Sequence, residues 1–255
     1  MAVEPIRSLE SPGGLLKEFV WRTNFTRRMC LDPGLPQQLT EELWTDPDRL
    51  VAQGELLKHG GRTTVVRVEA CDRSGKRTPW LLKRYNLRGP LHTLVHFCMR
   101  SRARTSWLNG HRLQSLGITT PLPRAYVEHR IGPLRTRSFL LTDFVHGTNW
   151  EEALYHETDV PELTNDVLAR LTELWARLAE GRVSIGDARL ANFLLTGDGR
   201  VWMIDLDSMR THRVGLTYSL ARRRDKARFL QDWRGAPHLE EVVRGAIDGS
   251  LKPAA

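Results

Sequence analysis

The chain has 255 residues, 40% of them hydrophobic, and a formal net charge of +8. No apolar run is long enough to cross a bilayer, and three scattered cysteines (Cys30, Cys71 and Cys98) are too few for a disulfide framework or a zinc site, so we expect reduced cysteines and a cytoplasmic protein. The positive charge favours a polyanionic partner (nucleic acid, an anionic membrane face or a phosphorylated glycolipid), but no zinc-finger, RNP or homeodomain pattern accompanies it.

The first 45 residues are predicted to be an irregular or partly helical leader. The opening residues, MAVEPIRSLESPGG, lack the basic start and apolar core of a secretory signal, so we expect none here. Residues 15–25, LLKEFVWRTNF, have the pattern of a short amphipathic helix.

From residue 55 the pattern becomes that of β-strands. Two β-type runs flank Gly60-Gly61, and a third run, PWLLKRY, carries Lys83 among apolar residues, where a charge is unexpected without a partner. Arg84 points to the opposite face of that strand. The alternative for the third run is an edge strand with both cations solvated. Gly60 and Gly61 allow close approach of backbone to a ligand, and they fit a plain hairpin turn equally well.

A helix is predicted over 101–116, and strands over 124–130 and 137–145. Thr148 and Glu151 have the spacing of a capping box that opens a further helix. The next helix is the most strongly patterned of the chain, because apolar residues recur at three- and four-residue steps over 160–179, with Pro161 suited to its first turn. Two more helices are predicted after residue 215.

The stretch from 185 to 208, IGDARLANFLLTGDGRVWMIDLDS, holds the pattern that points to chemistry. Two apolar runs around a Gly-Asp-Gly turn predict a hairpin that Asn192 enters and Asp205 leaves. Phosphoryl transfer needs a carboxylate to orient the attacking hydroxyl and oxygen ligands to hold Mg²⁺. Asp187 precedes Asn192 by five residues, as in the catalytic loop of protein kinases. The alternative is an ordinary surface hairpin with solvated acids.

This segment resembles the catalytic core of the lipopolysaccharide kinase family, which covers Kdo and core-heptose kinases and is distantly related to protein kinases. The resemblance spans roughly residues 50 to 235, and three other stretches agree with it: WLLKRYNLRG, SRARTSWLNGHRLQSLGITTPLP and GPLRTRSFLLTDFVHG. It implies an α+β, bilobal, protein-kinase-like fold. After a leader over 1–45 we expect an antiparallel-sheet N-lobe over 46–145 and a mainly helical C-lobe over 146–255.

The resemblance also implies roles for single residues. Asp187 would orient the acceptor hydroxyl, and Arg189 would support the transferring phosphoryl group. Asn192 and Asp205 would bind Mg²⁺. Asp205 is expected to end the strand directly, whereas Asp207 falls in the next turn and would support the metal site from outside or contact the substrate.

On the nucleotide side of the site, Lys83, Gly60 and Gly61 would hold the phosphates of ATP. Asp143 and Phe144 would lie in the hinge that takes the adenine through backbone groups.

The expected substrate is a sugar hydroxyl of the lipopolysaccharide inner core, on Kdo or heptose, in the glycolipid or its precursor. We expect a cytoplasmic enzyme with peripheral contact at the inner membrane and no nucleic-acid partner. Two departures from the family pattern motivate the alternative of a nucleotide-binding pseudokinase scaffold. Helix 101–116 contains no acid, with Ser106 where core-heptose kinases usually offer a Glu before Trp107, and Ile185 replaces the usual His. A basic nucleic-acid-binding protein is a further alternative that rests on charge alone.

Overall fold

The structure, a computed structural model of the chain, describes residues 2–4, 19–71, 75–86, 100–131, 134–155 and 163–249. The chain divides into two compact units of mixed α and β structure. The first comprises Met1–His111 and Pro121–Phe144, and the second comprises Arg112–Thr120 and Val145–Ala255. Within the described ranges, no helix is both long enough and apolar enough to span a membrane.

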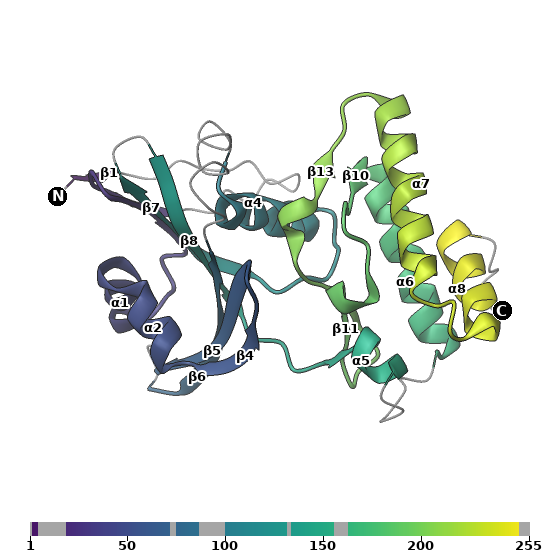
Figure 1. Cartoon of the computed structure of the whole chain (residues 1–255), viewed down its shortest axis with the longest axis horizontal. Coiled ribbons are helices and arrows are strands. Elements are labelled where there is room, and N and C mark those ends of the chain that lie inside the picture. The colour runs from purple at the N-terminus through teal and green to yellow at the C-terminus, as the bar shows by residue number, and fades with distance from the viewer. Residues whose placement is uncertain are drawn as a thin grey trace. The chain divides into compact units, whose positions relative to one another are not determined.

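A large antiparallel sheet forms the first unit (Figure 1). In spatial order its described strands are β1 (Ala2–Glu4), β2 (Val20–Thr23), β3 (Arg27–Leu31), β7 (Pro123–Ile131), β8 (Leu134–Asp143), β6 (Arg77–Tyr85), β5 (Thr63–Cys71) and β4 (Glu55–His59). The strands predicted between residues 55 and 85 are confirmed by β4, β5 and β6. Those predicted over 124–130 and 137–145 are confirmed by β7 and β8, of which β8 starts and ends earlier than predicted. Strand β6 lies between β5 and β8, so it is an interior strand.

Both faces of this sheet are covered by helices. Alternate residues of a strand point to opposite sides, so each face contributes its own set of side chains to a separate core. One face packs against α1 (Gln37–Thr45) and α2 (Pro47–Gln53), with Leu82 of β6 in its core. The other face packs against α4 (Arg102–Ser115), and Tyr85 and Trp107 belong to its core. The helix predicted over 101–116 is confirmed by α4.

The prediction of an irregular or partly helical leader holds only in part. Residues 37–45 form the helix α1, but the short helix predicted over 15–25 is wrong for its described residues. Residues 20–31 form the strands β2 and β3, which pair with each other, and β3 pairs in turn with β7. The side chains of Phe19, Met29 and Cys30 are fully buried by this arrangement. The apolar pattern of these residues is compatible with a short helix, but pairing with strand β7, about a hundred positions later, stabilises a strand instead. Local periodicity cannot detect such a distant partner.

The second unit is mainly helical, with two small sheets. Its described elements are β9 (Thr148–Asn149), α5 (Trp150–Tyr155), α6 (Asn165–Glu180), β10 (Val183–Ser184), β11 (Phe193–Leu195), β12 (Val201–Met203), β13 (Arg210–Thr211), α7 (Gly215–Gln231) and α8 (Pro237–Asp248). Its core joins apolar residues of α6, the β11–β12 hairpin, α7 and α8. Figure 1 shows α6, α7 and α8 lying side by side.

Two helix starts differ from the sequence prediction. The helix predicted over 160–179 begins at Asn165, where the Thr164 side chain accepts a hydrogen bond from the Val167 N–H; Pro161 lies outside the described residues. For α5 the capping side chain is Asn149, which accepts from the N–H of Glu151 at 2.9 Å. Thr148, the predicted capping residue, lies instead in the small sheet, where it is paired with Leu195.

Candidate active site

The predicted hairpin is confirmed by β11 and β12, which pair with Phe193 opposite Met203. Beyond that pair the Ile204 N–H donates to the carbonyl of Asn192 at 2.9 Å. Asn192 therefore lies beside the residue that precedes Asp205, at the same end of the hairpin.

Asp187 and Asn192 are in direct contact. The Asn192 Nδ2 donates to the Asp187 carbonyl at 2.8 Å and approaches the Asp187 carboxylate at 3.4 Å. Asn192 is buried, whereas the side chain of Asp187 is exposed. The side-chain nitrogen of Asn192 is directed to Asp187. The side-chain oxygen, Oδ1, is therefore the atom of this residue that could serve as a metal ligand.

A buried carboxylate on α7 holds the start of this loop. Asp225 accepts hydrogen bonds from the N–H groups of Ile185 at 2.6 Å and of Gly186 at 3.0 Å. Burial raises the pKa of Asp225, and the two backbone donors act in the opposite direction because they stabilise the charged form. This anchor is not among the residues predicted from the sequence. Its only local signal is one acid within the arginine-rich run ARRRDKARF, at the position four residues before the buried Phe229.

A second carboxylate at the end of α7 holds the other side of the loop, since Asp232 accepts from the Leu190 N–H at 2.9 Å. The backbone turn at residue 186, where the loop starts, requires a glycine. Gly186 has φ +80°, and a Cβ there would collide with the carbonyl of Ser208.

Asp205 also has left-handed backbone, with φ 58° and ψ 64°, and its side chain is exposed. Such a conformation is uncommon for residues other than glycine, with asparagine and aspartate enriched in it. Asp207 lies in the 3-10 turn that follows, Leu206–Ser208.

Arg189 is tethered within the second unit. Its guanidinium lies 3.3 Å from a carboxylate oxygen of Glu151 on α5, and both side chains are partly exposed. The sequence predicts a capping role for Glu151 and gives no local sign of this ion pair.

Lys83, in the first unit, is only 8% exposed. Because β6 is an interior strand, the alternative of an edge strand with solvated cations is wrong. The Lys83 ammonium lies 5.1 Å from the centroid of the Tyr85 ring, on the face of the sheet that α4 covers. Arg84 points to the other face, as predicted, and forms an ion pair of 3.0 Å with Asp48 of α2.

The Gly60-Gly61 segment has the geometry of a hairpin turn. The Gly60 N–H donates to the Thr63 carbonyl at 2.9 Å, and the Gly60 carbonyl accepts from the Asn86 side chain at 3.3 Å. A Cβ on Gly61 would meet nothing within 4 Å. The turn itself therefore does not require glycine at that position.

Asp143 ends β8, and its carboxylate is bound by Arg124 through two hydrogen bonds of 2.7 and 3.0 Å. Its N–H donates to the Leu122 carbonyl at 3.0 Å. The side chain and the amide of Asp143 thus already have partners in the protein, and its carbonyl accepts from the Thr142 hydroxyl at 3.1 Å.

Comparison with known proteins decides the family of this chain. The family model described as "Lipopolysaccharide kinase (Kdo/WaaP) family" matches residues 42–233. The chain belongs to the lipopolysaccharide kinase family. Its members are kinases that act on the lipopolysaccharide core, so the protein is an ATP-using phosphotransferase.

Among solved structures the chain is similar to one described as "WaaP in complex with acyl carrier protein". The two sequences are 18% identical, the TM-score is 0.56, and the match covers 84% of this chain and 88% of the other. At this identity the likeness concerns the fold. No curated protein matches the chain.

The two departures from the lipopolysaccharide kinase pattern have structural counterparts. At the position of the usual helix Glu, Ser106 is buried and shares a hydrogen bond of 3.0 Å with the Tyr85 hydroxyl. At the position of the usual His, Ile185 is buried in the core of the second unit, while its N–H is held by Asp225. Packing and a backbone anchor thus support the loop of this family member.

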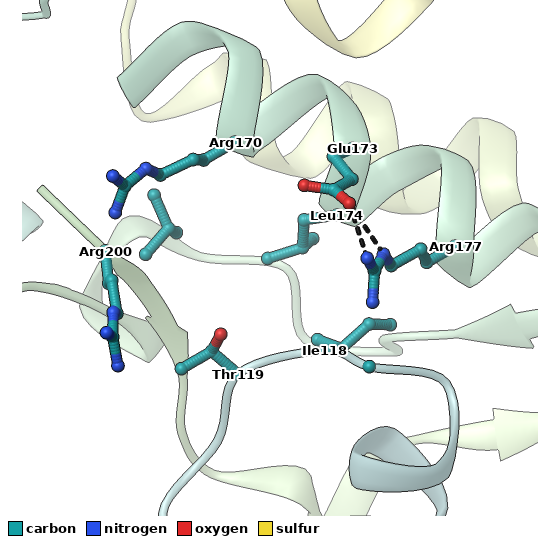
Figure 2. A pocket seen from close by; sticks show the side chains of 9 residues that line it. Ile118, Thr119, Arg170, Glu173, Leu174, Arg177 and Arg200 are labelled. Carbon is teal, nitrogen blue, oxygen red and sulfur yellow. Dashed lines mark hydrogen bonds and ion pairs between the residues drawn. The ribbon is translucent and has the colours of Figure 1, made fainter. Parts of the chain in front are cut away.

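A cavity of about 220 Å³ lies elsewhere in the second unit, beside α6 (Figure 2). None of the predicted site residues lines it. Three arginines line it, and each is paired with a carboxylate: Arg170 with Asp166, Arg177 with Glu173, and Arg200 with Asp198. With its cations neutralised in this way, the cavity has little attraction for an anion.

Proposed function

We propose that this lipopolysaccharide kinase transfers the γ-phosphoryl group of ATP to a sugar hydroxyl of the inner core, on Kdo or heptose. The observation that carries the proposal is the loop in which Asp187 is exposed while its backbone and neighbours are fixed. Asn192 donates to the Asp187 carbonyl at 2.8 Å, and Asp225 binds the N–H groups just before it. A fixed and accessible carboxylate is what orientation of an attacking hydroxyl requires.

In this proposal Asp187 accepts a hydrogen bond from the acceptor hydroxyl and takes its proton as the new bond to phosphorus forms. General-base positioning of this kind contributes typically about 10²–10⁴ in rate. Arg189 stabilises charge on the transferring group with a planar and permanently charged side chain. Its contact with Glu151 positions the guanidinium while leaving it partly exposed.

The residues at the end of the hairpin fit Mg²⁺. Among the described residues there is no cluster of three or more His, Cys, Asp or Glu side chains that could bind a metal unaided. Mg²⁺ commonly takes one or two protein oxygens and completes its shell with water and substrate phosphates. The amide oxygen of Asn192 and the carboxylate of Asp205 would supply those protein ligands. The bound ion would neutralise phosphate charge during transfer.

On the nucleotide side, Lys83 would pair with the phosphates, and the Gly60-Gly61 turn would cover them with backbone groups. The carbonyl of Asp143 and the backbone of Phe144 would receive the adenine. These assignments require the two units to act as the N-lobe and C-lobe of a protein-kinase-like fold, and we propose that they do so.

We further propose a cytoplasmic location with peripheral contact at the inner membrane, where the lipopolysaccharide core or its precursor would be the acceptor. A net charge of +8 suits an acidic glycolipid. The competing function is that of a nucleotide-binding pseudokinase scaffold. The specific observation in its favour is that the Ser106 hydroxyl occupies the position of the helix Glu.

The test is turnover of radiolabelled ATP with Mg²⁺ and lipopolysaccharide core that lacks the phosphate. We expect incorporation of label that depends on the acceptor, and mass spectrometry should show one phosphate on a single sugar. Cells without the gene should lose that phosphate. Binding of Mg·ATP without transfer to Kdo or heptose acceptors would favour the scaffold, and absence of nucleotide binding would reject both functions.

A further inference from the structure

The N-terminal half of α7 exposes large apolar side chains. Val214 is 59% exposed, Leu216 is 72% exposed and Leu220 is 52% exposed. A water-facing leucine is not unusual in isolation, but here two occur one turn apart on the same helix face, beside an exposed valine. This concentration needs a physical explanation.

Arginines surround these apolar residues, and the acid that follows them, Asp225, is buried and directed to the N–H groups of Ile185 and Gly186. From residue 210 to residue 224 the chain reads RTHRVGLTYSLARRR, without Asp or Glu. The five arginines of this run form no ion pair with any described carboxylate: Arg210, Arg213, Arg222, Arg223 and Arg224. The arginines of the cavity beside α6 are in contrast all paired, and Figure 2 shows the pair of Arg177 with Glu173.

The apolar and basic side chains share one face of the helix. Residues three or four positions apart lie on the same side of an α-helix. Leu220 follows Leu216 by four positions, and Arg223 and Arg224 follow Leu220 by three and four, so all four share one side of α7. The opposite side of α7 faces the protein, since Asp225 anchors the Asp187 loop and Phe229 is fully buried.

The segment that enters this helix is fixed in place. The carbonyl of Arg213 accepts from the Arg182 guanidinium at 3.2 Å. His212 contacts the hydroxyl of Ser184 at 2.8 Å and that of Thr217 at 3.3 Å. In Figure 1 this segment joins β13 to the start of α7. The apolar residues are therefore presented by an ordered element of the fold.

We propose that this outer face of α7, defined by Val214, Leu216, Leu220, Arg223 and Arg224, binds an anionic lipid bilayer. Leucines among unpaired arginines match a membrane surface, in which acyl chains lie beneath negatively charged headgroups. A protein partner of stable affinity would need a complementary surface of about 800 Å² per side, larger than three separate apolar side chains provide. The inference rests on the proposed function, because a glycolipid acceptor would be presented at such a surface.

The test is sedimentation of the full chain with vesicles of phosphatidylcholine alone and of phosphatidylcholine mixed with phosphatidylglycerol. We expect binding to the mixed vesicles only, weakening as salt increases. Arg223→Glu/Arg224→Glu should reduce the vesicle partition coefficient by more than about tenfold, and Leu216→Ser/Leu220→Ser by about tenfold.

Matched controls come from the first unit. Leu56 and Leu57 on β4 are 59% and 44% exposed, so Leu56→Ser/Leu57→Ser removes similar apolar surface. Arg49→Glu/Arg77→Glu makes the same change in net charge. Both controls should bind vesicles as the unaltered chain does. If vesicle binding falls equally in the α7 variants and in the control variants, the chain is attracted to the membrane through its overall charge, and the proposed binding surface is rejected.

Two readouts separate this proposal from the proposed function. Mg·ATP binding by thermal shift should be unchanged in the α7 variants, which also shows that they fold. Phosphorylation of a delipidated, water-soluble core oligosaccharide should be unchanged, while phosphorylation of core glycolipid embedded in mixed vesicles should fall about tenfold. A chain that binds mixed vesicles but phosphorylates neither acceptor would reject only the proposed function. A chain that ignores the vesicles but binds purified acyl carrier protein through this face would reject the membrane.

Discussion

The loop that carries Asp187 and the strand that carries Lys83 are positioned by different means. The loop is irregular backbone, and carboxylates from a helix about forty residues later hold its N–H groups: Asp225 binds Ile185 and Gly186, and Asp232 binds Leu190. Lys83 lies in a regular interior strand, where the pairing of β6 with β5 and β8 fixes its place.

This difference teaches where each of the two regions is vulnerable to substitution. A loop held by two side chains can lose its geometry through one substitution on α7, at a distance from the chemistry. A residue in an interior strand is held by many backbone hydrogen bonds, so single side-chain changes around it should alter the local charge more than the local geometry. The predictions below test that contrast, from the largest expected effect to the smallest.

Among the residues of the loop, Asp187 should have the largest effect on the rate of phosphoryl transfer. Asp187→Ala should lower kcat by about 10²–10⁴, because the acceptor hydroxyl loses the carboxylate that orients it. The affinity for ATP should stay within a few-fold, since nothing that binds nucleotide is removed. Single-turnover assays with a filter-binding control would measure both. Near-normal turnover in a folded Asp187→Ala protein would remove this residue from the mechanism.

On the strand, Lys83→Met should weaken ATP binding and lower transfer by about 10²–10³, the effect of removing one charge that stabilises a transition state. Arg84→Met is the matched control, because Arg84 lies on the opposite face and binds Asp48 at 3.0 Å. It should cost at most about 1 kcal/mol of stability, as a partly exposed ion pair does, with transfer unchanged. Equal effects of the two substitutions would contradict a phosphate-binding role for Lys83.

The same contrast explains how much could be inferred from the sequence. Strand β6, the hairpin of β11 and β12, and helix α6 follow from periods of two and of 3.6 residues and from turn residues, all of which are local signals. The place of Lys83 within β6 could therefore be predicted, as could the positions of Asn192 just before β11 and of Asp205 shortly after β12.

The remaining features depend on contacts between distant parts of the chain. Asp225 gives no local sign that it binds the backbone of residue 185, and the pairing of β3 with β7 joins residues about a hundred positions apart. The contact of Ser106 with Tyr85 depends on how α4 packs on the sheet. None of these follows from a window of ten or fifteen residues.

The anchors on α7 should rank by the number of hydrogen bonds that each makes. Asp225→Ala leaves two N–H groups without their acceptor, the buried one of Ile185 at about 1–3 kcal/mol and the partly exposed one of Gly186 at less. Asp232→Ala removes one such bond, so it should destabilise the protein by about half as much. Urea unfolding followed by tryptophan fluorescence would give both values. If Asp225→Ala proves no more harmful than Asp232→Ala, hydrogen bonds to the loop backbone do not control its stability.

At the metal end of the hairpin, Asp205→Asn should weaken Mg²⁺-dependent nucleotide binding by about tenfold, as loss of one carboxylate ligand does in many sites. Asparagine tolerates the left-handed backbone of Asp205, so the substitution changes charge and not conformation. Asp207→Asn should have a much smaller effect, because that residue lies within the following turn. Thermal-shift titrations with Mg·ATP would compare them, and a larger effect at Asp207 would reverse the two assignments.

The smallest effect should come from a titrating group of the first unit. His129 lies on β7, its ring centroid is 5.3 Å from that of Phe139, and burial lowers its pKa, with the positive charge of Arg27 acting in the same direction. Between that lowered pKa and the unfolded value near 6.5, the unfolded chain binds more protons than the folded one. This contribution to stability is therefore present above pH 6.5 and is lost as the pH falls towards the folded pKa. His129→Phe keeps an aromatic ring against Phe139 and removes the titration, so its free energy of unfolding should depend less on pH in this window. Parallel slopes for the two proteins would show that His129 titrates alike in the folded and unfolded states.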